Sequence, residues 1–179
     1  VKSGTISPVF CGDAMLMRGM EQFMDGLCWL APSAADKGAE IGVDVDGNPV
    51  EIAVKEDAAT AAIVFKTISD QYGKYSMVKV LRGRITSDMA LYNPATGNTE
   101  KLGRLYIMKG KKGEEVKEIC CGDIGAIGKM DKVKTGDSLC EPKTYVKFAP
   151  LAFAPACYER AISPKTKQEI EKLGTGLNK

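Results

Sequence analysis

The fold of this sequence is decided by Gly122-Asp123-Ile124-Gly125-Ala126-Ile127 and by the later Thr135-Gly136-Asp137-Ser138-Leu139. Each stretch places a Gly-Asp turn directly before a short apolar segment, which is typical of a turn that leads into a buried β-strand. From residue 61 onward, further short strand-like segments alternate with turn-forming residues at intervals of about eight to twelve residues. This spacing predicts a closed antiparallel β-barrel over residues 58–143.

The sequence before this barrel has a different character. Residues 5–11 predict a short buried strand, and residues 15–30 predict an amphipathic helix with one apolar face, ended by Ala31-Pro32-Ser33. Residues 33–57 predict a linker that contains a β-hairpin around Asp46-Gly47-Asn48-Pro49. The sequence leaves open whether this linker packs on the barrel.

The sequence after the barrel also predicts a small piece of another domain. Residues 145–153 favour a strand that Pro150 breaks. Ser163-Pro164 then favours a helix start, with Ile170, Leu173 and Leu177 on its buried face. The fold class is therefore mainly β, with partial α/β pieces in residues 1–32 and 144–179, each too small to be a domain by itself.

Composition excludes several kinds of site. The chain has 179 residues and no histidine, which removes the usual general base and the common zinc ligand. The six cysteines include no C-x-x-C pair, and we interpret them as buried, reduced thiols of a cytoplasmic protein without a metal site. No apolar run approaches the length of a membrane span.

Charge is divided unevenly along the chain. Residues 1–57 hold 4 Lys and Arg against 10 Asp and Glu, a net charge of −6. Residues 58–143 hold 15 against 10, a net of +5, and residues 144–179 hold 6 against 3, a net of +3. A basic barrel favours a polyanionic partner, although a merely solvated basic surface is the competing interpretation.

Several motifs resemble those of elongation factor G, in the same order along the chain. The stretch Ala62–Asp70 with Gly73-Lys74 resembles the first barrel strand and turn of that factor. The stretch Val80-Leu81-Arg82-Gly83-Arg84-Ile85 resembles its second barrel strand. Residues 116–139 resemble the end of that factor's second domain. Residues 4–14 resemble the end of its GTPase domain, and residues 161–167 resemble the opening of its third domain. The resemblance implies a domain II barrel between remnants of two neighbouring domains.

The same resemblance implies a guanine-binding loop at Gly12, Asp13 and Ala14, where Asp13 replaces the usual serine. The phosphate-binding sequence G-x-x-x-x-G-K-[ST] is absent from the chain, so no loop is present to hold phosphates and magnesium. Lys129-Met130-Asp131 echoes a base-reading motif by letters only, because Gly128 replaces its asparagine. We therefore expect no catalytic residue and no GTP hydrolysis by this chain, with GTP and magnesium bound only by a full-length parent.

In the family, the second domain docks on the small ribosomal subunit, and this implies contact with ribosomal RNA. Arg82 and Arg84 flank a glycine that would let the backbone approach a partner. A Gly-rich tip holds three lysines, and two further cations precede it; the expected RNA-binding residues are Arg82, Arg84, Lys101, Arg104, Lys109, Lys111 and Lys112. Solvated hairpin tips are also commonly rich in lysine and glycine. The tyrosines at 72, 75, 92 and 106 favour barrel packing over base stacking.

The resemblance therefore predicts part of a cytoplasmic translocation factor whose partners are the ribosome and the neighbouring domains of its parent protein. One alternative is the same barrel in a ribosome-protection or release-factor relative. Another is a stand-alone barrel that binds RNA or protein.

Overall fold

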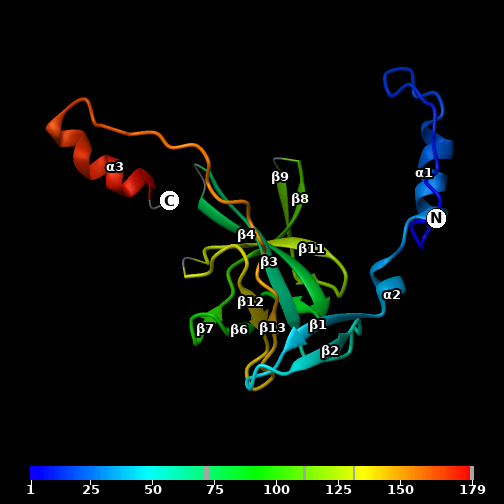
Figure 1. Cartoon of the computed structure of the whole chain (residues 1–179), viewed down its shortest axis with the longest axis horizontal. Coiled ribbons are helices and arrows are strands. Elements are labelled where there is room, and N and C mark those ends of the chain that lie inside the picture. The colour runs from blue at the N-terminus through cyan, green and yellow to red at the C-terminus, as the bar shows by residue number, and fades with distance from the viewer. Residues whose placement is uncertain (71–72, 111, 131, 178–179) are drawn as a thin grey trace.

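The computed structural model describes residues 1–70, 73–110, 112–130 and 132–177 (Figure 1). A mainly β centre carries two helical segments that project away from it. Its helices are α1 (Met20–Leu30), α2 (Ala34–Lys37), the short 3-10 helix η1 (Lys167–Glu169) and α3 (Ile170–Leu177). Its strands are β1 (Ala39–Val43), β2 (Pro49–Ala53), β3 (Ala61–Asp70), β4 (Gly73–Arg82), β5 (Ile85–Thr86), β6 (Ala90–Asn93), β7 (Asn98–Lys101), β8 (Leu105–Lys109), β9 (Lys112–Val116), β10 (Glu118–Ile119), β11 (Ile124–Gly128), β12 (Ser138–Cys140) and β13 (Lys147–Phe148).

The main sheet is antiparallel, and its eight strands follow the order β7-β6-β12-β3-β4-β11-β8-β9. The two Gly-Asp turns lead into β11 and β12, as the sequence predicts, and these strands pair with β4 and β3 respectively. Among the described residues no strand pair joins β7 to β9, while β5 and β10 pair separately. The mainly β class is thus confirmed, but closure of the sheet into a barrel is not.

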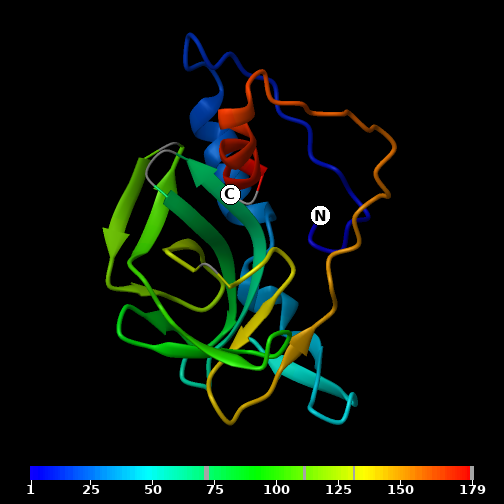
Figure 2. The same cartoon turned by 90° about the vertical axis from the view of Figure 1, so that its left-hand side faces the viewer.

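The sheet curves around one hydrophobic core (Figure 2). Along β4, Ser76, Val78 and Val80 are fully buried, whereas Met77 and Lys79 between them are only half-buried. This period of two is that of a strand with one face in the core. Each large apolar side chain buried here stabilises the fold by about 1.5–3 kcal/mol. The core contains Ala62, Val64, Val78, Val80, Ile85, Leu91, Leu102, Leu105, Ile119, Ile127, Met130, Val133 and Leu139.

A second, smaller sheet packs on the outside of the first. It has the order β13-β1-β2, so it joins the predicted hairpin to a strand from far along the chain. Its buried side chains Ile52, Val146 and Phe148 form a cluster with residues of β3, β4 and β12. The Phe148 N–H also donates to the Ser138 hydroxyl at 2.9 Å. The hairpin within residues 33–57 is therefore packed on the main sheet, which the sequence left open.

The N-terminal segment differs from its prediction. Residues 5–11 form no strand and are exposed, and among the described residues no strand pairs with them. The helix begins at Met20 rather than at residue 15, since Asp13 and Arg18 exchange backbone hydrogen bonds of 2.9 and 3.0 Å in a tight turn. The helix does end at Leu30, before Ala31-Pro32.

The C-terminal segment is also shorter in regular structure than predicted. Only Lys147–Phe148 of the predicted strand 145–153 is a strand, because only those residues have β1 as a partner. The helical segment starts after Thr166 rather than at Ser163, where the Glu169 carboxylate accepts from the Lys165 and Thr166 N–H groups, both at 3.2 Å. Ile170 and Leu177 are exposed and Leu173 is half-buried, so the residues that the structure describes do not bury the predicted apolar face of α3.

The cysteines are only partly in the core. Cys140 is buried and Cys120 and Cys121 are half-buried, and this desolvation raises the pKa of all three thiols. Cys11, Cys28 and Cys157 lie in the flanking segments and are exposed, so the expectation of burial is wrong for them. In the described ranges no helix is long and apolar enough to cross a membrane.

Candidate functional site

The Arg82-Gly83-Arg84 bend lies against the chain's own backbone. Gly83 is buried with φ +71°, and its N–H donates to the Lys55 carbonyl at 2.8 Å. A Cβ at this position would lie 2.5 Å from the Ala58 carbonyl oxygen. The glycine therefore lets residues 55–60 approach the bend, and the space that the sequence assigned to a partner is occupied by this loop.

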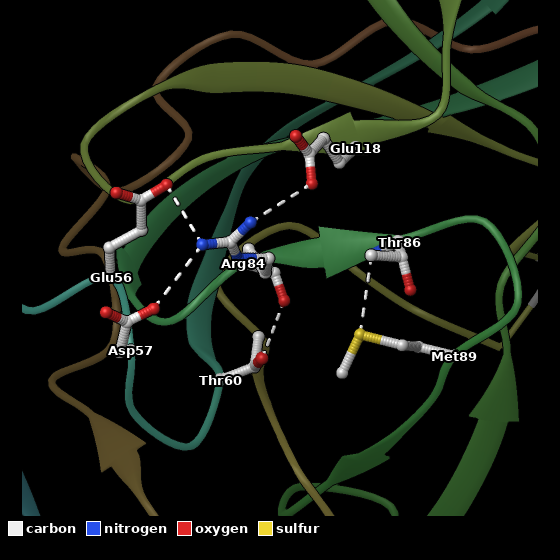
Figure 3. Close-up of polar contacts among 7 residues, drawn as sticks. All are labelled: Glu56, Asp57, Thr60, Arg84, Thr86, Met89 and Glu118. Carbon is white, nitrogen blue, oxygen red and sulfur yellow. Dashed lines mark hydrogen bonds and ion pairs between the residues drawn. The ribbon is translucent and has the colours of Figure 1, made fainter.

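The two arginines of the bend make contacts within the chain. Arg82 is half-buried, and its Nε donates to the Ala59 carbonyl at 2.7 Å. The Arg84 guanidinium faces Glu56 at 3.2 Å, Asp57 at 3.5 Å and Glu118 at 3.4 Å (Figure 3). Three carboxylates around one guanidinium more than offset its charge, so Arg84 is poorly placed to bind a phosphate. Sequence reasoning missed these acids because they come from separate segments.

The hairpin of β8 and β9 gathers the other predicted cations. Lys109 and Lys112 lie directly opposite each other in the strand register, a placement that is unfavourable for like charges. An ion pair from Lys109 to Glu114 relieves part of this repulsion and lowers the pKa of the Glu114 carboxyl. Lys112 is exposed and has no ion pair among the described residues. The hairpin end is thus a basic surface with one uncompensated lysine.

Two other predicted cations lie nearby in the chain but on different elements. Arg104 directly precedes β8 and pairs with Glu115 of β9 at 3.4 Å, with its side chain 73% exposed. Lys101 ends β7, on a separate hairpin, and is exposed. Lys111 lies outside the described residues. The structure therefore brings together Arg104, Lys109 and Lys112 on one hairpin and separates them from the carboxylate-bound bend.

A hollow of about 840 Å³ opens beside this hairpin. Its walls come from residues 102–106, the end of β9 and the end of β11. Besides Arg104 they include Lys117 and Lys129, two cations that the sequence reading did not select. Lys129 was noted there only for its chance likeness to a base-reading motif. In the sequence, the only indication that Lys117 belongs to this site was its position directly after the basic hairpin.

Tyr75, Tyr92 and Tyr106 each pack against another tyrosine ring, as the sequence predicted. The rings of Tyr75 and Tyr106 meet edge to face with centroids 5.6 Å apart, and those of Tyr92 and Tyr145 lie 6.3 Å apart. Tyr72 lies outside the described residues. Tyr106 is also one of the residues that line the hollow.

The predicted guanine loop forms a self-contained turn. The Asp13 N–H donates to the Arg18 carbonyl at 2.9 Å, and the Asp13 carboxylate accepts from the N–H groups of Met15 and Leu16 at 2.9 and 3.1 Å. A Cβ on Gly12 would lie 2.9 Å from the Arg18 carbonyl oxygen, so the turn is tight. The Asp13 N–H is therefore already used within the chain, and the assignment of Gly12, Asp13 and Ala14 to a guanine base stays a prediction.

The fold and its surface define a mainly β domain with a curved antiparallel sheet and a basic hairpin. Residues 59–142 match the family model described as elongation factor G domain 2. This segment is accordingly similar to domain II of translation elongation factors, and the match supports the resemblance seen in the sequence at that level. The match covers somewhat less than half of the 179 residues and lies within the central, packed part of the molecule.

Proposed function

We propose that this chain is part of a ribosomal translocation factor similar to elongation factor G, acting in the cytoplasm. In this proposal residues 59–142 dock on the small ribosomal subunit, through its RNA, during GTP-dependent elongation. The match of this segment to elongation factor G domain 2 carries the proposal. The exposed cations of the β8–β9 hairpin support it, since RNA helices are recognised largely through backbone charge and shape.

The proposal assigns no catalysis to the chain itself. The phosphate-binding sequence is absent and the turn at Gly12-Asp13-Ala14 uses its own donor internally. Any GTP and magnesium would be held by other parts of such a factor, and the neighbouring domains would be its intramolecular partners. A ribosome-protection or release-factor relative with the same second domain is the second candidate, because the match describes only that domain.

Binding of the whole chain to purified small ribosomal subunits tests the docking proposal. We expect binding whose logarithm falls linearly with the logarithm of salt concentration. Replacing Lys109 and Lys112 together with alanine should weaken binding and reduce that slope by about 1 for each lost phosphate contact. The matched control replaces Lys165 and Lys167, two exposed lysines in the C-terminal segment, and should change neither quantity.

Failure of the unaltered chain to bind small subunits at low salt would contradict docking. An equal loss in both double variants would instead show that only general charge matters. The absence of catalysis is checked by phosphate release from GTP in the same mixtures. Release above that of subunits alone would show that the chain does hydrolyse GTP.

A further inference from the structure

The hollow beside the β8–β9 hairpin has a preformed floor. Gly103 and Gly128 approach so closely that a Cβ on Gly103 would lie 2.1 Å from the Gly128 carbonyl oxygen. The Gly128 N–H donates to the Arg104 carbonyl at 3.0 Å, which holds the two segments together. The close approach of these two glycines fixes this part of the wall. Its volume of about 840 Å³ is within the usual range for ligand sites.

The lining of the hollow combines apolar and aromatic surface. Leu102, Tyr106 and Val116 all contribute to its walls. The Tyr106 ring is held in place edge to face by Tyr75, so its orientation is set before any ligand binds. An ordered aromatic ring beside aliphatic side chains is suited to the flat face of a nucleic-acid base.

Positive charge surrounds this lining. Arg104, Lys117 and Lys129 all line the hollow and are exposed. Glu115 offsets one of these charges through its pairing with Arg104 at 3.4 Å, which leaves an excess of two positive charges. In the part of the chain that the structure describes, neither Lys117 nor Lys129 forms an ion pair. The two lysines are therefore available to an anionic ligand.

We propose that this hollow binds a single-stranded RNA segment, with a base against Tyr106 and neighbouring phosphates at Lys117 and Lys129. The inference rests on the proposed function and identifies which part of the RNA is recognised. Bases in a duplex are stacked and paired, so they cannot enter a hollow, whereas an unpaired base can. The charge excess favours a polyanion over a protein segment, and the apolar lining distinguishes this hollow from a simple phosphate-binding surface.

Binding of a fluorescein-labelled oligouridylate of about 10 nucleotides to the whole chain tests this assignment. The variant with Lys117→Ala and Lys129→Ala should bind about 20-fold more weakly at 0.1 M salt, because each single-strand contact contributes about 0.7 to the salt slope. A duplex of the same length should compete poorly. The control variant, Lys143→Ala with Lys147→Ala, removes the same charge from exposed positions that do not line the hollow.

The control also matches the backbone, because Lys129 and Lys143 both have positive φ, at 60° and 73°. Equal affinity of the two double variants for the oligonucleotide, or better competition by the duplex, would overturn the assignment. Binding to ribosomal subunits without binding to the oligonucleotide would reject the hollow but leave docking in place. Oligonucleotide binding without subunit binding would reject docking and leave the hollow as a site for single strands.

Discussion

The packed centre and the flanking segments of this molecule contain similar sequence patterns but have very different surroundings. In the centre, residues 39–148, core side chains such as Leu105 and Ile127 are fully buried. In the flanks, Met24 is 57% exposed and Leu27 is 42% exposed, although the α1 sequence is amphipathic. An apolar stripe therefore predicts a helix, but it buries surface only where another element covers it. The following predictions test this difference, from the largest expected effect to the smallest.

The largest expected difference in unfolding free energy between the centre and the flanks is that between two leucine-to-alanine variants. Leu139→Ala removes a fully buried side chain from the main core and should lower the free energy of unfolding by about 2–5 kcal/mol. Leu16→Ala changes a side chain that is 61% exposed and should alter it by no more than about 0.5 kcal/mol. Urea unfolding of both variants measures the difference. Similar losses in the two variants would show that the N-terminal segment is packed in solution.

A pair of glycines tests the contact between the bend and residues 55–60. Gly83 and Gly110 both have positive φ, at 71° and 63°, so alanine should cost about 1–2 kcal/mol at either position from backbone strain alone. At Gly83 the added Cβ also meets the Ala58 carbonyl at 2.5 Å, whereas at Gly110 it meets nothing within 4 Å. We expect a total loss of roughly 3 kcal/mol for Gly83→Ala. If thermal or urea unfolding gives equal losses, the loop does not pack on the bend.

The smallest expected effect on stability concerns Asp36, which stabilises the start of α2 through local hydrogen bonds and not through burial. Its carboxylate accepts from the Ser33 N–H at 2.8 Å and pairs with Lys2 at 2.9 Å, which lowers its pKa from 3.8 to about 2. Because the folded-state pKa is depressed, its contribution is present above about pH 4 and is lost as the pH falls toward 2. An NMR titration of Lys2→Ala should show a partial rise in this pKa, since the Ser33 bond remains.

The matched control for this titration is Lys37→Ala, because Lys37 pairs with Glu40 and not with Asp36. It should leave the Asp36 pKa unchanged. A rise of equal size in both variants would mean that the general field of positive charge, rather than the Lys2 contact, depresses the pKa.

The parts of the fold that local chemistry determines could be predicted. The Gly-Asp turns before β11 and β12 and the turn at Asp46-Gly47-Asn48 depend on residues that favour tight turns, and all three precede the expected strands. The strand predicted at residues 5–11 did not form, and only Lys147–Phe148 of the strand predicted at residues 145–153 did. A strand requires a paired neighbour, and sequence alone does not show whether one is present. Segments of similar apolar content therefore formed strands only where another strand lay beside them.

The candidate site shows the same limit. The sequence placed cations at the β8–β9 hairpin because they lie close together along the chain. It did not show that Arg84 would be surrounded by Glu56, Asp57 and Glu118, or that Lys117 and Lys129 would line one hollow with Arg104. Those groupings join residues from separate strands and loops, which only the pairing of the strands brings together.

By itself, the sequence determined a mainly β centre with short strands and a basic central region, and its motifs resemble those of elongation factor G domain II in the same order. The strands and the charge follow from local turn preference, alternation of apolar residues and composition. The tertiary structure decided that the hairpin of β1 and β2 joins β13, and that one arginine is neutralised while two lysines remain available. Strand pairing and ion pairing both depend on the distance between residues that are remote in sequence, because hydrogen bonds and charges act through space.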